Sequence, residues 1–240
     1  MEILIGDEAD LAHAVAKRVS TILNAESRPR IGLATGKSLR HSYEILHALH
    51  QDQHIRLTDA TWVMLDEYLG LPIGHERTFE MELRRSLFAG LPLDGVDLIS
   101  PLARDTSVED NLRAFRALIN AEPVHLQLLG IGRNGHIAFN EPGSDFASTA
   151  RVIALSQATR DDMVRDGWDE AESPSHAVTQ GLSDIMLARE VVLLALGEAK
   201  IEPIRRAFRE PPSSSCPASV LQGHPNVKLF LTPEVARGLR

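Results

Sequence analysis

The glycine-rich segment GIGRNGHIAFNEPGS at 130–144 holds a histidine and a glutamate five residues apart. Its glycines at 130, 132 and 135 let the backbone approach a ligand closely. A histidine with a nearby carboxylate is a common acid–base pair, so His136 and Glu141 are candidate catalytic residues. A metal site is less well supported, because these two side chains fall short of the usual three protein ligands. The chain also lacks the G-x-S-x-G of a serine hydrolase.

A second segment, IGLATGKS at 31–38, combines the features of an anion-binding turn. It ends like a nucleotide-binding P-loop, but its two glycines enclose three residues where the P-loop has four. Gly36 lets backbone N–H groups approach an anion, and the start of the following helix adds partial positive charge. Thr35 and Ser38 can donate hydrogen bonds and Lys37 can add a charge. A monophosphate site and a plain turn capped by Ser38 both remain open.

A third segment, WVMLDEYLGLP at 62–72, places two carboxylates directly after an apolar run. In an extended chain, adjacent side chains point to opposite sides, so we expect either Asp66 or Glu67 to face a cleft. A carboxylate there can act as a general base, which typically contributes about 10²–10⁴ in rate. A solvated acid or a helix cap is the alternative, and on this segment alone it is the better one.

Two cations lie near the expected starts of helices, where the helix dipole disfavours positive charge. They are Arg160, in QATRDDM, and Lys200, in GEAKIEP. This local conflict is expected if both residues serve a bound anion, although most surface lysines and arginines are simply solvated.

Short apolar runs alternate with helical patterns along nearly the whole chain. We expect helices that begin at residue 7 or 8 and that span 38–49, 78–89, 107–121, 157–166 and 198–209. We expect strands at 2–5, 30–35, 61–66, 96–100, 124–132, 151–155, 190–197 and 226–232. The run at 124–132 is apolar at both odd and even positions, as in a strand covered on both faces.

This alternation predicts an α/β fold, namely a three-layer, Rossmann-like open sheet that is mostly parallel, with helices on both faces. The 240 residues fit one domain spanning 1–240, since the pattern resumes after each loop. Ligands of such sheets bind beyond the carboxyl ends of the strands. The three polar segments all follow strands there, and this coincidence is the main reason to expect an active site.

The composition excludes several classes of function. A net charge of −8 argues against a general nucleic-acid or membrane-surface binder, because both need a basic surface. No apolar run approaches the roughly 20 residues of a membrane span. The single cysteine, Cys216, cannot form an intrachain disulfide and fits a cytoplasmic protein. We expect a small-molecule ligand, no nucleic acid and no membrane.

Four stretches of the chain are similar to the glucosamine-6-phosphate deaminase (isomerase) family: LDEYLGLP, GIGRNGHIAFNEP, AVTQGLSDIMLAREVVLLALGEAK and PASVLQGHPNVKLFL. The similarity runs from about residue 31 to residue 230. The superfamily also contains 6-phosphogluconolactonases, which share the fold and a GxGxDGH start. Those enzymes typically continue toward a TASLFP-like sequence and tend to have a DER-like element where this chain has DEY. Both departures favour the deaminases.

The resemblance implies conversion of an amino-sugar 6-phosphate to a ketose 6-phosphate and ammonia, with no metal and no organic cofactor. By position, Asp66 would be the base that moves a proton between C2 and C1 of the opened sugar. His136 would move the proton for ring opening, with Glu141 holding and tuning it. Asn134 falls where many members have Asp, so its role would be hydrogen bonding rather than charge.

The resemblance also places the substrate's phosphate on the turn that comprises Thr35, Gly36, Lys37 and Ser38, with Arg160 and Lys200 reaching it. Lys37 replaces the small residue more usual in the family. It either adds a phosphate contact or points to solvent, and the sequence leaves both open.

Three other functions compete with a glucosamine-6-phosphate deaminase. The preferred amino sugar could be galactosamine 6-phosphate, because the C4 configuration is read by the shape of the pocket. A 6-phosphogluconolactonase would share the fold and phosphate turn. A non-catalytic sugar-phosphate sensor would explain Asn134 and Lys37. The resemblance leaves the assembly as a monomer or small homo-oligomer.

Overall fold

The computed structural model describes residues 1–72, 74–102, 106–165, 167–170 and 172–240. Its largest element is a seven-stranded sheet in which every neighbouring pair is parallel. In spatial order the strands are β1 (Glu2–Ile5), β10 (Val227–Leu231), β9 (Val191–Ala195), β6 (Leu126–Leu129), β2 (Arg30–Leu33), β3 (Thr61–Met64) and β5 (Asp97–Ile99). All residues of the central strands β2, β6 and β9 are buried, as strands covered on both faces require.

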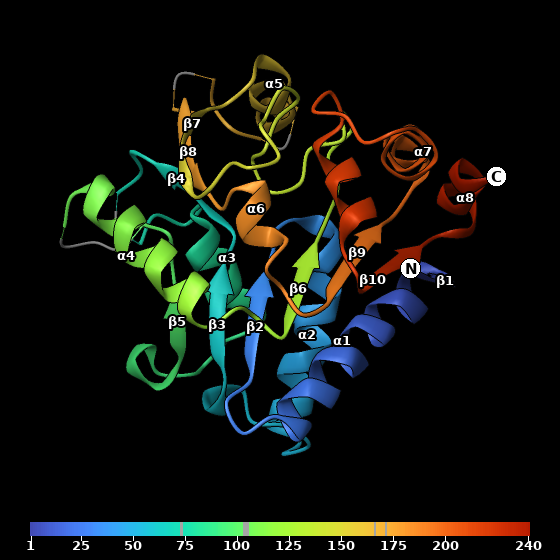
Figure 1. The fold of residues 1–240 in the computed structure, drawn as a ribbon. Helices are drawn as coiled ribbons and strands as arrows, with labels where there is room; N and C mark the ends of the chain where they lie inside the picture. Colours follow the sequence, from blue (N-terminus) through green and yellow to red (C-terminus); the bar gives the residue numbers. More distant parts are fainter. Residues whose placement is uncertain (73, 103–105, 166, 171) are drawn as a thin grey trace.

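Helices cover both faces of this sheet (Figure 1). On one face α1 (Glu8–Ala25) packs beside α2 (Lys37–Gln51), which contacts α3 (Phe79–Ser86). The other face carries α4 (Val108–Ala121), α6 (Leu182–Ile185) and α7 (Ile201–Arg209), and α8 (Pro233–Ala236) follows the last strand. Short 3₁₀ helices lie at Leu57–Asp59, Leu93–Gly95, Glu198–Lys200, Pro217–Gly223 and Arg237–Leu239. The predicted α/β fold with a mostly parallel sheet is therefore confirmed.

Local sequence explains where the helices begin and which side they bury. Asp7 caps α1 by accepting the Asp10 N–H at 2.8 Å, and Ser107 and Thr78 cap α4 and α3 in the same way. The stripe on α1 that the sequence predicts is buried against the sheet: Leu11, Val15, Val19 and Ile22.

A second, three-stranded sheet lies above the carboxyl ends of β2, β3 and β6 (Figure 1). It is antiparallel, in the order β4 (Asp66–Leu69), β8 (His176–Thr179) and β7 (Arg151–Ala154), and α5 (Gln157–Arg165) packs over it. The sequence did not predict this sheet. The sequence predicts one strand at 61–66 and another at 151–155, both within a single, mostly parallel sheet.

Leu65 explains why the run at 61–66 divides. Its N–H donates to the carbonyl of Leu33 in the large sheet at 3.1 Å, while its own carbonyl accepts the Gln180 N–H next to the small sheet at 2.7 Å. The chain therefore passes from one sheet to the other at this residue. The result is that Asp66 begins the small sheet directly above the carboxyl end of β3.

No helix in the described ranges is long and apolar enough to cross a membrane.

Candidate active site

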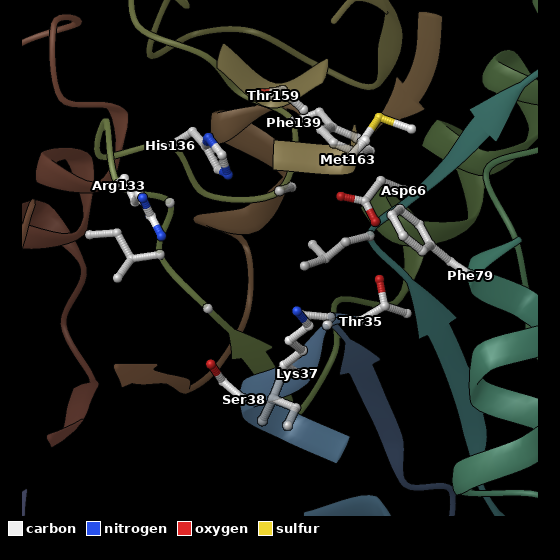
Figure 2. Close-up of a pocket in the computed structure, with 18 of the residues that line it drawn as sticks. Thr35, Lys37, Ser38, Asp66, Phe79, Arg133, His136, Phe139, Thr159 and Met163 are labelled. Carbon is white, nitrogen blue, oxygen red and sulfur yellow. The ribbon is translucent and has the colours of Figure 1, made fainter. Parts of the chain in front are cut away.

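A cavity of about 480 Å³ lies between the carboxyl edge of the large sheet and the small sheet with α5. All three segments singled out in the sequence contribute to its lining. Figure 2 shows the turn with Thr35, Lys37 and Ser38 on one side of this cavity, and Asp66 and His136 on opposing sides above it. The polar segments that follow three different strands therefore meet at one site.

The turn after β2 presents the start of α2 to the cavity. Gly36 precedes the helix with φ at 109°, a left-handed conformation that favours glycine, and the residues from Thr35 to Ser38 all line the cavity. The first N–H groups of a helix have no partner within it, so this end suits an anion. The Lys37 side chain is exposed and extends toward the cavity that it lines, so a phosphate contact stays a prediction (Figure 2).

Asp66 is the carboxylate that faces the cavity. Its residue is 7% exposed. Burial, and then the negative charges of Glu67 and Glu82, raise the pKa of Asp66 well above its ordinary value. No described residue donates a hydrogen bond to its carboxylate. A carboxylate with a raised pKa that opens onto a cavity has the properties of a general base.

Glu67 turns to the other side of β4, as strand alternation predicts for one of the two carboxylates. It accepts the N–H groups of Tyr68 at 2.8 Å, Phe79 at 3.1 Å and Glu80 at 3.0 Å. Two of these donors begin α3, so Glu67 binds the start of that helix. Asp66 is thus free to face the cavity because its neighbour anchors the chain.

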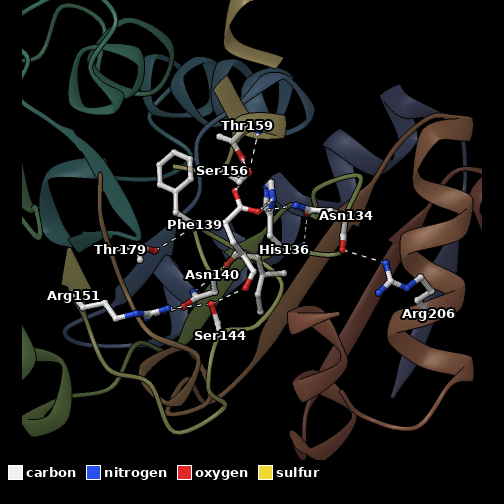
Figure 3. A network of polar contacts seen from close by, with 12 residues as sticks. Asn134, His136, Phe139, Asn140, Ser144, Arg151, Ser156, Thr159, Thr179 and Arg206 are labelled. Carbon is white, nitrogen blue, oxygen red and sulfur yellow. Dashed lines mark hydrogen bonds and ion pairs between the residues drawn. The ribbon is translucent and has the colours of Figure 1, made fainter. Parts of the chain in front are cut away.

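His136 reaches the cavity from the loop after β6, in which it lies next to Asn134 (Figure 3). Glu141 is close to His136 but does not line the cavity. The Nδ1 atom of His136 lies 3.7 Å from the Oε2 atom of Glu141, too far for a hydrogen bond, and this buried Nδ1 has no hydrogen-bond partner among the described residues. Asn134 organises the loop between them. Its amide donates to Glu141 Oε2 at 2.7 Å, and its Oδ1 accepts the His136 N–H at 3.1 Å.

Glu141 is held in the ionised form. Burial acts to raise its pKa, but the His136 imidazole, the Thr159 hydroxyl and the Asn134 amide outweigh this effect and lower the pKa to about 2. Ser156 also donates to Glu141, at 3.0 Å. Since Thr159 lies on α5 and lines the cavity, Glu141 connects the helix above the cavity with the histidine loop.

Gly132 makes room for the imidazole of His136. A Cβ atom at this position would lie 2.3 Å from the ring, closer than any packing allows. By contrast, a Cβ atom at Gly130, which also lines the cavity, would have no neighbour within 4 Å. The first of these glycines is therefore required by the packing of His136, and the second is not.

The structure brings together most of the predicted site residues, with one clear exception. Lys200 lines the cavity, whereas Arg160 does not. Arg160 donates to Gln157 on its own helix at 2.5 Å and lines a separate surface groove. Its position one turn from the start of α5 did not reveal which side of the helix it occupies.

Asn134 and Glu141 are not among the residues that line the cavity, so their contact with a ligand would pass through His136. The sequence analysis also missed two cations that do line it, Arg133 and Arg165. Arg133 stands between predicted residues in the GIGRNGH segment, so its place in that segment was the available signal.

Aromatic and sulfur-containing side chains from β4, α3, the loop after β6, α5 and the segment after α5 form one wall of the cavity. The lining includes Tyr68, Phe79, Phe139, Met163 and Trp168. The Tyr68 ring lies near the Phe79, Phe139 and Trp168 rings, with centroids 4.5, 5.7 and 5.4 Å away. The sequence does not predict this wall, because its formation depends on the small sheet. Among the described residues, no three histidine, cysteine or carboxylate groups come together as a metal site requires.

Residues 6–229 match the family described as glucosamine-6-phosphate isomerases/6-phosphogluconolactonase. A protein of Cutibacterium acnes named glucosamine-6-phosphate deaminase is 39% identical, covering 100% of this chain and 92% of its own length. One of the same name from Beutenbergia cavernae is 37% identical, covering 99% and 92%.

Solved structures show the same architecture. A structure described as a monomeric glucosamine-6-phosphate deaminase superimposes with a TM-score of 0.91 at 29% identity, and all of both chains is covered. The 6-phosphogluconolactonase of Trypanosoma brucei superimposes with a TM-score of 0.78 at 22% identity, covering 100% of this chain and 98% of its own. The second similarity is at the level of the fold.

Proposed function

The chain belongs to the family of glucosamine-6-phosphate isomerases and 6-phosphogluconolactonases, and within it we propose that the chain is a glucosamine-6-phosphate deaminase. It converts glucosamine 6-phosphate and water to fructose 6-phosphate and ammonia. The named relatives at 37–39% identity support the deaminase side of the family, as does the 29% identical solved structure. The lactonase comparison supports the fold alone.

One observation carries this proposal: a histidine and a buried carboxylate that accepts no hydrogen bond from the described residues face the same cavity, and an anion-binding turn opens onto it. The turn suits the phosphate of the sugar, with N–H and hydroxyl donors and the cations Lys37 and Lys200. Asp66 and His136 then meet the other end of the substrate, where the reacting carbons lie. Arg160 does not line the cavity and donates to Gln157, so its contact with the phosphate stays a prediction.

The chemistry follows from the two groups. His136 moves a proton between the ring oxygen and the C1 hydroxyl, which opens the sugar to its aldehyde. Asp66 as carboxylate takes the proton from C2, and the C1 carbonyl oxygen receives a proton from the substrate ammonium, which gives a C1–C2 enolamine. Asp66 then returns its proton to C1, and the C2–N bond becomes an iminium. Water then adds at C2, and ammonia leaves as the ketone forms. A raised pKa makes Asp66 a better base for the C2 proton than an ordinary aspartate.

Glu141 acts through His136. The ionised carboxylate at 3.7 Å stabilises the imidazolium that forms when His136 takes a proton. Asn134 donates to the same carboxylate oxygen and fixes the loop, which is the hydrogen-bonding role expected from the sequence.

Residues 1–240 act as one domain in this proposal, because both sheets contribute residues to the cavity. The assembly in this proposal is a monomer or a small homo-oligomer, and the 29% identical solved structure described as monomeric supports the first. The single cysteine fits a cytoplasmic enzyme.

Ammonia release from purified protein tests the proposal and separates it from its competitors. Glucosamine 6-phosphate and galactosamine 6-phosphate are supplied in parallel, and 6-phosphogluconolactone is supplied in a third assay of lactone hydrolysis. We expect ammonia from glucosamine 6-phosphate at the highest kcat/KM. A preference for galactosamine 6-phosphate would reassign the substrate. Lactone hydrolysis with no ammonia from either hexosamine would make the chain a lactonase, and binding without any turnover would make it a sensor.

A further inference from the structure

Glu82 contacts the anion-binding turn at 35–38 from outside the cavity. It lies on α3, and its Oε1 atom accepts the Gly36 N–H at 3.1 Å. The same oxygen lies 3.8 Å from a guanidinium nitrogen of Arg40, one turn into α2. Glu82 therefore joins the start of α2 to α3 through one carboxylate oxygen.

Glu82 is not among the residues that line the cavity, whereas Gly36 is. The carboxylate thus holds the turn from outside. A Cβ atom added at Gly36 would have no neighbour within 4 Å, and Gly36 adopts a φ of 109°. Little side-chain packing therefore restrains this residue. The hydrogen bond from the Gly36 N–H to Glu82 links this peptide to α3 and fixes its orientation. The orientation of this peptide in turn sets the direction of the Thr35–Ser38 groups that face the cavity.

The charge of Glu82 has the opposite effect on a bound phosphate. A carboxylate next to the start of α2 offsets the partial positive charge that the helix offers to an anion. Arg40 compensates only in part, because its side chain is 53% exposed and therefore well solvated. Position and charge at Glu82 thus act on phosphate affinity with opposite signs.

We propose that Glu82 is a positioning residue for the phosphate turn: its oxygen holds the Gly36 peptide, and its charge limits how tightly the turn binds a phosphate dianion. The proposal rests on the proposed function for the identity of the substrate, but the turn can be tested without it. Its purpose in catalysis is to keep the site ordered without retaining the phosphorylated product too strongly.

Two substitutions separate the two effects. Glu82→Gln keeps an oxygen that can accept the Gly36 N–H and removes the charge, whereas Glu82→Ala removes both. Glu44→Gln is the matched control, since Glu44 lies on α2, pairs with His41 at 3.3 Å and loses the same charge away from the turn. Each protein is titrated with inorganic phosphate by calorimetry, and kcat and KM for glucosamine 6-phosphate are measured by ammonia release.

We expect Glu82→Gln to bind phosphate about three- to tenfold more tightly than wild type, the size of one like charge removed at close range in a solvated site. We expect Glu82→Ala to bind it at least about threefold more weakly, because the freed turn must be ordered on binding. KM should follow the same order as the phosphate affinities, and Glu44→Gln should match wild type in phosphate affinity, KM and kcat.

Equal phosphate affinities for the two Glu82 variants, or the reverse order, would overturn the proposal. The glutamine variant keeps the test decisive if the alanine variant folds poorly, because no loss of structure produces tighter binding. If wild type releases no ammonia while phosphate affinities follow the expected order, the proposed function fails and the role of Glu82 stands.

Discussion

The substitution Asp66→Asn should remove activity and stabilise the protein at the same time. Asparagine keeps the shape of the side chain but cannot accept the C2 proton. We expect ammonia release to fall by at least about 10³, toward the upper end of what a general base contributes. Inorganic phosphate should still bind, because its turn lies on a different strand connection.

The gain in stability follows from the burial of Asp66. Its residue is 7% exposed, no described residue donates a hydrogen bond to its carboxylate, and Glu67 and Glu82 add like charge. Keeping such a group ionised is unfavourable, so a neutral amide of the same shape should raise the free energy of unfolding by about 1–3 kcal/mol. For a domain of this size, that corresponds to a rise in Tm of roughly 2–10 °C.

The raised pKa of Asp66 also determines how the gain in stability changes with pH. The folded-state pKa of Asp66 lies above its ordinary value of 3.8, so the folded protein holds this proton more tightly than the unfolded chain. The carboxylate therefore reduces stability as the pH rises from 3.8 through the raised pKa, and the reduction persists above it. The advantage of Asp66→Asn should therefore be larger at pH 7 than at pH 4, and should shrink as the pH approaches 4.

Thermal unfolding of both proteins between pH 4 and pH 8 measures this advantage. An equal or lower Tm for Asp66→Asn at pH 7, or an advantage of the same size at pH 4, would refute the reasoning that a buried, unpartnered carboxylate is the base.

Other predictions concern the histidine loop. Gly132→Ala places a methyl group 2.3 Å from the His136 ring and should lower kcat by at least about tenfold. Gly130→Ala adds a methyl group with no neighbour within 4 Å, so its kcat should lie within about threefold of wild type. Equal effects of the two substitutions on kcat would contradict the packing argument. Glu141→Gln removes the anion 3.7 Å from His136 and should lower kcat by about 10- to 1000-fold with little change in KM, and a kcat within about threefold of wild type would rule out its role. Because the pKa of Glu141 is about 2 rather than 4.5, its carboxylate contributes stability that is complete above about pH 5 and lost as the pH falls toward 2. Chemical denaturation should show wild type losing stability relative to Glu141→Gln across that window, and parallel curves would argue against the low pKa.

The large sheet could be predicted because its strands are apolar at successive positions. The segments around β6 and β9 have few polar residues, and strands of that kind need helices on both faces. The meeting of three polar segments at one edge then followed from the parallel arrangement. Alternation also predicted that one of Asp66 and Glu67 would face the cavity. The structure was needed to show which of the two faces the cavity, because this depends on the contact of Glu67 with the start of α3.

The small sheet could not be predicted, since its pairing is between segments far apart in the chain. At Leu65 one residue hydrogen-bonds to both sheets, and no local signal marks a change of partner within an apolar run. The aromatic wall of the cavity and the inward placement of Arg165 depend on this sheet and on α5. The groove that Arg160 lines could not be predicted for a related reason: distance from a helix start says nothing of the face that packs inward.

The account rests on one reaction at one cavity, and product analysis tests it most directly. Wild-type protein and Asp66→Asn are incubated with glucosamine 6-phosphate, and ammonia and fructose 6-phosphate are measured in the same samples. We predict equimolar ammonia and fructose 6-phosphate from wild type, and neither above background from Asp66→Asn. Absence of both products with wild type, or their undiminished formation by the variant, would contradict it.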